Sequence, residues 1–297
     1  MIPTTVIGSF PAPLEGGSYA RSYFDGEPRD AGRDSLELAV KSQAEAGIDI
    51  VADGQTKSDF ITLFAKSFRG VVMQTRPVVI GELEHVSYAT VDDQKLAKSL
   101  RPKGTKLKGI MTGPYTMAKN TNDMHYGDIE ELAFAYASGL AKEAKELSNI
   151  VDYVQVDEPF FSVDFPGYGK DLLGEFFSDV SVPKMLHVCG DVSHIFADLV
   201  EYPVDYLEHE FAASPQIWDV AADIDFPQTL GVGVARSDKN KAESVKEIST
   251  RMETAISMLD PSKLMFNPDC GLRNLDLSVA SEKLSNIVAA RDGLENG

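Results

Sequence analysis

Both cysteines of the chain lie in short motifs beside other residues that can bind a metal ion. Cys189 closes the sequence HVC, which begins at His187, and Cys270 lies in NPDCGL. His187 and Cys189 are two residues apart, so on an extended segment both side chains point to the same side. Together with Glu210 and Cys270, these two residues offer one nitrogen, one oxygen and two sulfur donors, a set that suits tetrahedral zinc. The sequence therefore predicts a zinc site of His187, Cys189, Glu210 and Cys270.

Sulfur-rich ligation also indicates a type of reaction. Two thiolates and one carboxylate carry more negative charge than a zinc ion neutralises, so the metal would be a weak Lewis acid. A thiol that joined such a site could lose its proton and stay nucleophilic, because little charge leaves its sulfur. Thiol alkylation fits this site better than activation of water.

Each of these residues has a plainer interpretation when it is taken alone. A single histidine is often a hydrogen-bonded core residue, and a single cysteine is often a small buried apolar residue. The metal hypothesis depends on convergence, since both cysteines of the chain lie at the ends of predicted strands. The other histidines have weaker cases, and His209 would point away from Glu210 on a regular strand.

Eight short apolar runs, each bounded by turn or charged residues, predict the strands that position the site. They are residues 4–8, 49–53, 107–113, 153–159, 184–190, 204–210, 229–235 and 263–269. Apolar residues at helical spacing predict helices over 36–47, 129–147, 241–259 and 279–294. Strands that alternate with helices favour a (β/α)₈ TIM barrel, and an open doubly wound sheet is the structural alternative.

One long gap interrupts this alternation between the second and third predicted strands. Residues 76–94 alternate in polarity, which predicts an extra β-hairpin outside the barrel. No linker or shift in composition divides the chain, so we expect a single barrel domain over residues 1–297.

Polar residues gather where the predicted strands end, which is the catalytic face of a barrel of this kind. They are Ser9, Asp53, Gln55, Asp157, Glu158, His187, Cys189, Glu210, Asp238 and Cys270. The sequence therefore predicts that these residues surround one site.

Composition excludes several classes of partner. The chain has 46 acidic and 28 basic residues, and its net charge of -18 repels nucleic acids and anionic lipid surfaces. It has only two cysteines, too few for a disulfide framework, and it has no apolar run long enough to span a bilayer. We expect a cytoplasmic protein that binds neither nucleic acid nor membrane.

The motifs resemble those of a known family. TTVIGSFP (4–11), TGP (112–114), QVDEP (155–159), HVC and NPDCGL resemble the catalytic half of cobalamin-independent methionine synthase, and above all the short, archaeal-type core enzymes. The resemblance implies a (β/α)₈ barrel in which zinc, on the same four ligands, binds the sulfur of homocysteine.

The same resemblance implies which residues hold the rest of the substrate. Ile7, Gly8 and Ser9 would bind the amino-acid end of homocysteine, and Asp157 would pair with its ammonium group. A carboxylate suits that position, since a buried ammonium ion needs an opposite charge. Glu158 is expected to be structural.

Three positions depart from the pattern of the long, folate-using members. Gln55 stands where those enzymes have a carboxylate that contacts the amino acid, so the resemblance places it among the substrate-binding residues. Asn120 replaces a tryptophan that stacks on the pterin, and Asp238 lies roughly where they have a catalytic histidine. These departures favour methylcobalamin, carried by a corrinoid protein, as the methyl donor.

Other functions stay open at this point. Methyltetrahydrofolate is the alternative donor, and another thiol such as coenzyme M is the alternative acceptor. A rival of a different class is a non-catalytic protein that binds zinc and a thiol amino acid.

Overall fold

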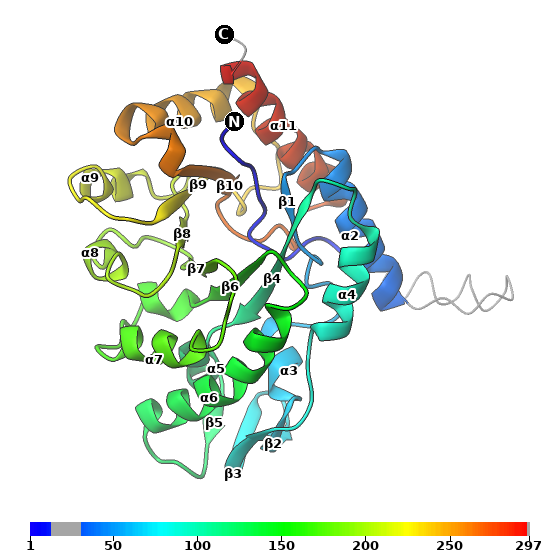
Figure 1. Ribbon diagram of the computed structural model, residues 1–297, viewed down its shortest axis with the longest axis vertical. Coiled ribbons are helices and arrows are strands. Elements are labelled where there is room, and N and C mark those ends of the chain that lie inside the picture. Colours follow the sequence, from blue (N-terminus) through cyan, green and yellow to red (C-terminus); the bar gives the residue numbers. More distant parts are fainter. Residues whose placement is uncertain (13–30, 296–297) are drawn as a thin grey trace, which may run out of the picture.

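A curled sheet of seven parallel strands lies at the centre of the computed structural model, which describes residues 1–12 and 31–295. Neighbouring strands follow in the order β1, β4, β6, β7, β8, β9 and β10 (Figure 1). Their bounds are β1 (Ile50–Val51), β4 (Lys106–Thr112), β6 (Tyr153–Asp157), β7 (Lys184–His187), β8 (Tyr206–His209), β9 (Thr229–Ala235) and β10 (Leu264–Pro268). Seven of the eight predicted strands are therefore present.

The N-terminal segment lies between the two edge strands. Thr4 forms an isolated parallel bridge with Phe266 of β10, and Thr5 forms one with Ile50 of β1. In Figure 1 this dark blue segment runs beside both strands. The strand predicted over residues 4–8 is thus reduced to two bridges, because it shares too few backbone hydrogen bonds with its neighbours for a ladder. The fold is a TIM-barrel type whose ring of strands is not strictly closed.

Helices cover the outside of the curled sheet (Figure 1). The main ones are α2 (Ala31–Glu45), α4 (Val91–Leu100), α6 (Ile129–Leu147), α7 (Gly169–Phe176), α10 (Val245–Met258) and α11 (Leu277–Glu295). Shorter ones are α3 (Phe60–Ala65), α5 (Pro114–Lys119), α8 (Phe196–Leu199) and α9 (Trp218–Ala221). The helix predicted over residues 129–147 matches α6 at both ends, and Asp128 accepts hydrogen bonds from the first free N–H groups of that helix.

The excursion after β1 is a small separate sheet. Strands β2 (Phe68–Met73) and β3 (Pro77–His85) pair antiparallel, and β5 (Asn122–Asp123) adds a parallel edge. The hairpin itself is confirmed, but its predicted position over 76–94 is wrong. Its first strand precedes residue 76, and residues 91–94 begin α4 instead, since the carboxylate of Glu143 binds the N–H groups of Ala89 and Thr90 ahead of that helix.

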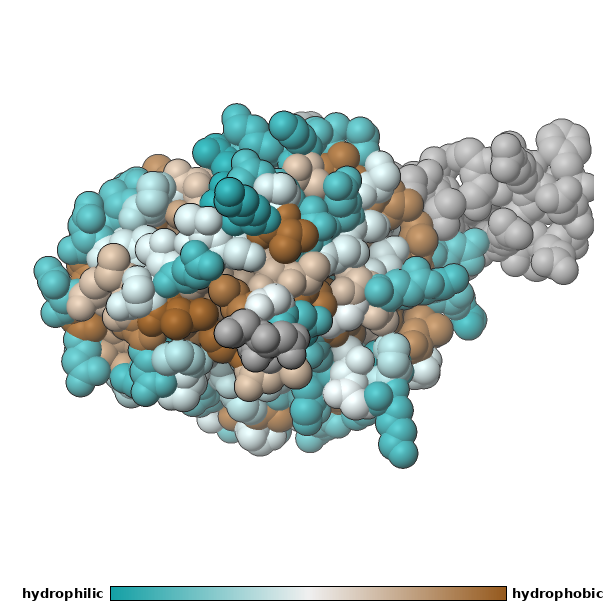
Figure 2. Space-filling view, turned by 90° about the horizontal axis from the view of Figure 1, so that it is seen from above, coloured by the Kyte–Doolittle hydropathy of each residue, from teal (hydrophilic) through white to brown (hydrophobic). Residues whose placement is uncertain are grey.

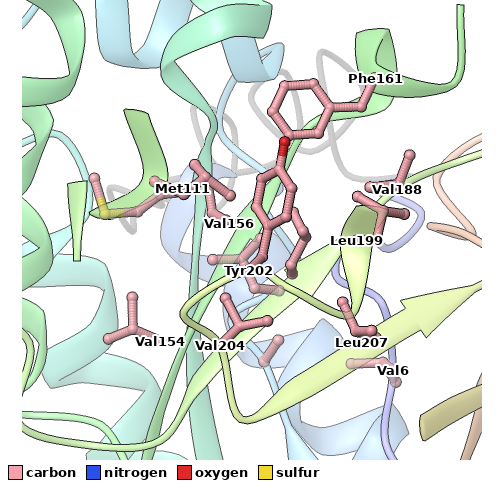
Figure 3. Packing of buried hydrophobic residues seen from close by; sticks show 14 of the residues in the cluster. Val6, Met111, Val154, Val156, Phe161, Val188, Leu199, Tyr202, Val204 and Leu207 are labelled. Atoms are coloured by element: carbon pink, nitrogen blue, oxygen red, sulfur yellow. The ribbon is translucent and has the colours of Figure 1, made fainter. Parts of the chain in front are cut away.

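Alternating side chains divide the core into an outer and an inner part. Val154 and Val156 of β6 and Leu207 of β8 belong to the large cluster between sheet and helices, which Figure 3 shows. Residues of the opposite parity point into the ring. There Lys108 of β4 and Glu208 of β8 form an ion pair with both side chains fully buried. Gln155 and Asp157 share this inner side of β6, so the alternation aims polar groups at the centre of the ring.

The surface is mixed in polarity. Figure 2 shows a face on which hydrophilic residues alternate with smaller hydrophobic areas. Within the described part of the chain, no helix is long and apolar enough to cross a membrane.

Candidate metal and substrate site

Three side chains from two distant segments of the chain meet at the C-terminal end of the ring. His187 ends β7, Cys189 follows it, and Cys270 follows β10. The Nε2 atom of His187 lies 3.0 Å from Sγ of Cys189, which lies 3.0 Å from Sγ of Cys270. One donor atom from each residue lies within 4.8 Å of the other two, and both thiols are free. In residues 1–12 and 31–295 this is the one group of His, Cys, Asp or Glu that could hold a metal ion in this way.

A backbone hydrogen bond fixes the orientation of the imidazole ring. Nδ1 of His187 lies 3.0 Å from the carbonyl oxygen of Glu208, so Nδ1–H must be the donor. The Nε2 atom then faces the two sulfur atoms, and in the neutral ring it would offer its lone pair to an ion. Histidines that bind metals are usually held by such a contact on the other ring nitrogen.

The three groups also change one another's proton affinities. A hydrogen bond from Cys189 lowers the pKa of the Cys270 thiol well below its usual value, although burial opposes this effect. Burial would lower the pKa of His187, but the hydrogen bond and charge of Cys270 raise it to about 9. The cluster therefore favours a thiolate at Cys270 before any ion is considered.

Glu210 lies beside this cluster and is not part of it. The side chain of Cys189 and the N–H of Gly190 lie near enough to lower the pKa of its carboxylate, but it is not within 4.8 Å of all three donor atoms. Burial raises its pKa, and the negative charge of Cys270 raises it further. The fourth predicted ligand is thus a neighbour of the cluster.

A pocket of about 470 Å³ opens over the three donors. Seven predicted residues line it, namely Ile7, Ser9, Gln55, Asp157, His187, Cys189 and Cys270. Its other lining residues are Asp59, Phe60, Pro159, Gly271, Arg273 and Asn274. Most of the residues selected from the sequence therefore meet at one cavity.

The wall around Ser9 and Gln55 depends on close backbone approaches. A Cβ atom on Gly8 would lie 2.6 Å from Ile110 and 3.3 Å from the side-chain oxygen of Gln55. One on Gly271 would lie 2.0 Å from the hydroxyl oxygen of Ser9. Gly8, which does not line the pocket itself, thus lets its neighbours pack against the wall. Gln55 has a φ of 47°, a left-handed conformation that is rare for a residue other than glycine and is often found at functional sites.

Gln155 connects Asp157 to the N-terminal segment through two hydrogen bonds. Nε2 of Gln155 donates to Oδ1 of Asp157 at 2.6 Å and to the carbonyl oxygen of Ile7 at 2.8 Å. Burial raises the pKa of Asp157 to about 6, against the opposing effects of His187 and Gln155. A cation bound beside this carboxylate would favour its charged form.

The acidic neighbour of Asp157 has a structural role. The carboxylate of Glu158 accepts hydrogen bonds from the N–H groups of Tyr115 and Thr116 and from the Thr116 hydroxyl, so it caps α5. A Cβ atom on Gly113 would lie 2.1 Å from this carboxylate. The side chain is held by the helix and does not line the pocket.

Several other residues chosen from the sequence lie outside the pocket. Asp238 is half exposed and forms a bidentate ion pair with Arg236, at 2.8 and 2.7 Å. Asn120 donates its amide to the carbonyl oxygen of Thr116. His209 packs against Phe196, and burial lowers its pKa to about 3.

Arg273 is the main lining residue that the sequence reasoning missed. It stands three residues after Cys270 in the loop that follows β10. The rule that selected the other polar residues at strand ends also applies to it. It lies one residue beyond the motif NPDCGL.

Residues 2–292 match a family model described as the catalytic domain of cobalamin-independent synthase. The chain belongs to this family. The methionine synthase of Methanothermobacter marburgensis is 32% identical over 313 residues, which cover 97% of this chain and 98% of the relative. That of Methanocaldococcus jannaschii is 30% identical over 309 residues, which cover 97% of each chain.

Solved structures agree in fold. A B12-independent methionine synthase from a Shewanella species, solved in complex with selenomethionine, superposes with a TM-score of 0.85 at 24% identity, covering 100% of this chain and 98% of that one. A methyltransferase from Methanosarcina mazei gives a TM-score of 0.69 at 16% identity, covering 99% and 94%. The predicted TIM-barrel architecture is thus confirmed.

The description of the family bears on the methyl donor. Its members are described as cobalamin-independent, which gives no support to the methylcobalamin donor or to the corrinoid partner expected from the sequence. The departures at Gln55, Asn120 and Asp238 that suggested this donor do not identify one, because two of the three residues lie outside the pocket.

Proposed function

We propose that the chain transfers a methyl group to the sulfur of homocysteine and so forms methionine. The observation that carries this proposal is the pocket in which His187, Cys189 and Cys270 lie beside Ser9 and Asp157. Such a pocket offers a position for a thiol next to groups that suit an amino acid. The selenomethionine bound by the Shewanella relative, a selenium analogue of methionine, is consistent with the same class of ligand.

The three clustered donors fit a catalytic zinc ion. One nitrogen and two sulfurs match the donor types that zinc prefers, and three protein ligands leave a fourth position for a substrate. Zinc bound there would lower the pKa of the homocysteine thiol, so that the sulfur is a nucleophilic thiolate at neutral pH. Glu210 beside Cys189 is proposed as the fourth protein ligand when no thiol is present.

The residues of the pocket would position the substrate for an in-line displacement. Asp157 would hold the ammonium group, while Ile7, Ser9 and Gln55 would form the wall along the amino-acid end. The absence of a side chain on Gly8 would let this wall pack closely. A lone pair of the sulfur forms the new bond to the methyl carbon as the bond from carbon to the donor breaks. The electron pair of that bond leaves with the donor. Fixed orientation of the two reactants is the main contribution of the protein.

The donor is tested by comparing two sources of the methyl group. The zinc-loaded full chain is incubated with homocysteine and either methyltetrahydrofolate or methylcobalamin, and methionine is measured by mass spectrometry. We expect methionine from one of the two donors and its loss in Cys270→Ser. The control Ser285→Ala, on the exposed side of α11, should keep full activity.

Two results of this assay would contradict the proposal. If homocysteine binds but no donor methylates it, the chain is a binding protein for a thiol amino acid. If coenzyme M is methylated faster than homocysteine in a competition between the two, the acceptor is a different thiol.

We also propose that the whole chain acts as one domain in a reducing compartment such as the cytoplasm. Arg291 near the C-terminus donates to Asp49 at 2.8 Å and to the carbonyl oxygen of Ile2 at 3.2 Å, so the two ends of the fold support each other. The two free thiols suit a reducing compartment.

A further inference from the structure

Arg273 places a positive charge in the wall of the pocket. Its Nη2 atom donates a hydrogen bond to the backbone carbonyl oxygen of Gln55. Among the described residues that line the cavity, no other lysine or arginine is present. Within residues 1–12 and 31–295 no carboxylate forms an ion pair with Arg273. The guanidinium group therefore keeps charge and N–H donors for a ligand, since only one of its five N–H groups serves Gln55.

The surroundings of Arg273 would otherwise repel an anion. Asp59 and Asp157 line the same pocket, and the chain as a whole carries a net charge of -18. The hydroxyl group of Ser9 is a neutral donor that cannot balance a carboxylate by itself. Because Gln55 is uncharged, it does not neutralise the arginine beside it. The pocket thus has one cationic part in an acidic environment.

The backbone holds Arg273 in place in the wall of the pocket. Gly54 and Gln55 have φ angles of 80° and 47°, and this left-handed turn carries the Gln55 carbonyl that accepts from Arg273. Oδ1 of Asp53 accepts the N–H of Gln55 at 3.2 Å, which fixes the turn from the other side. Ser9 touches the same loop at Gly271. Arg273 and Ser9 therefore belong to the same part of the pocket wall.

We propose that Arg273 binds the α-carboxylate of the substrate and makes the pocket select thiols that carry a carboxylate group. The inference rests on the proposed function and names the residue that recognises this end of the amino acid. With Asp157 on the ammonium group, the pocket would bind both charges of the zwitterion and leave the thiol for the three metal-binding donors. Bidentate pairing of a guanidinium with a carboxylate gives both affinity and geometric selectivity.

Calorimetric binding to the zinc-loaded full chain tests this role with two ligands. L-Homocysteine carries the carboxylate, and 3-aminopropane-1-thiol is the same molecule without it. In Arg273→Gln we expect homocysteine to bind about 10- to 100-fold more weakly, as for the loss of a charged hydrogen bond. The aminothiol should change by less than about 3-fold, since it never used the guanidinium. Arg69→Gln, an exposed arginine on the hairpin, is the matched control and should change neither ligand.

The pair of ligands separates recognition from structural support. Equal weakening of both ligands would show that Arg273 acts only through the Gln55 carbonyl and would overturn the proposal. Unchanged binding of homocysteine would also overturn it. If the wild-type chain binds no homocysteine at all, the proposed function fails before Arg273 is tested.

A lysine variant covers the case in which Arg273→Gln does not fold. Lysine keeps the charge but cannot serve the Gln55 carbonyl and both oxygens of a carboxylate at once. Arg273→Lys should therefore bind homocysteine with intermediate affinity and bind the aminothiol normally. Wild-type affinity for both ligands, or equal loss for both, would contradict the role.

Discussion

Removing one partner of the ion pair inside the ring should strongly destabilise the fold. Nζ of Lys108 lies 3.0 and 3.3 Å from the two carboxylate oxygens of Glu208, and both side chains are fully buried. Burial lowers the pKa of Lys108, and the charge of Glu208 opposes that shift. Lys108→Met would leave the carboxylate of Glu208 buried without a partner. We expect the free energy of unfolding to fall by about 3 to 5 kcal/mol.

An exposed pair of similar length provides the control. Lys145 lies 2.9 Å from Asp179, and these side chains are 60% and 59% exposed. Lys145→Met should cost less than about 1 kcal/mol, because water screens this pair. Comparing the two variants isolates the effect of burial on a contact of nearly equal length.

Urea denaturation at neutral pH, followed by circular dichroism, measures both effects. The double variant Lys108→Met with Glu208→Met should recover most of the lost stability, since both buried charges are then gone. A loss below about 1 kcal/mol in Lys108→Met, or no recovery in the double variant, would refute the reasoning.

Further predictions concern a buried acid, a close backbone approach and an exposed residue. Burial raises the pKa of Asp53 from 3.8 to about 6, so the folded state binds more protons in this range and its stability should fall as pH rises through it. The free energy of unfolding should fall by about 3 kcal/mol between pH 4 and pH 7. Asp53→Asn should remove this fall. Gly113→Ala should lower the melting temperature, because the new Cβ would overlap Glu158, whereas Gly174→Ala in open space should raise it slightly. Asp238→Ala should leave zinc content and homocysteine affinity unchanged, and a loss of either would place Asp238 in the site.

Local sequence patterns were enough to predict the strands and most of the pocket. The strand ends of a barrel converge whatever the loops do, so His187, Cys189 and Cys270 could be grouped before their distances were known. The helix over 129–147 was predicted because its apolar stripe is a local feature.

Features that depend on long-range contacts could not be predicted in the same way. The start of α4 depends on hydrogen bonds to Glu143, which is more than fifty residues further along the chain. The left-handed turn at Gln55 and its contact with Arg273 join the loops after β1 and β10. The distance of Glu210 from the three donors depends on the backbone conformation directly after β8. No spacing in the sequence specifies that conformation.

X-ray absorption at the zinc edge, with and without homocysteine, tests the central claim most directly. We predict one zinc ion per chain with two sulfur neighbours and at least one nitrogen neighbour from the protein, and a third sulfur neighbour once homocysteine is added. Cys270→Ser should remove one of the sulfur neighbours or abolish zinc binding. A purified chain that binds no zinc, or a zinc ion without sulfur neighbours, would contradict the account.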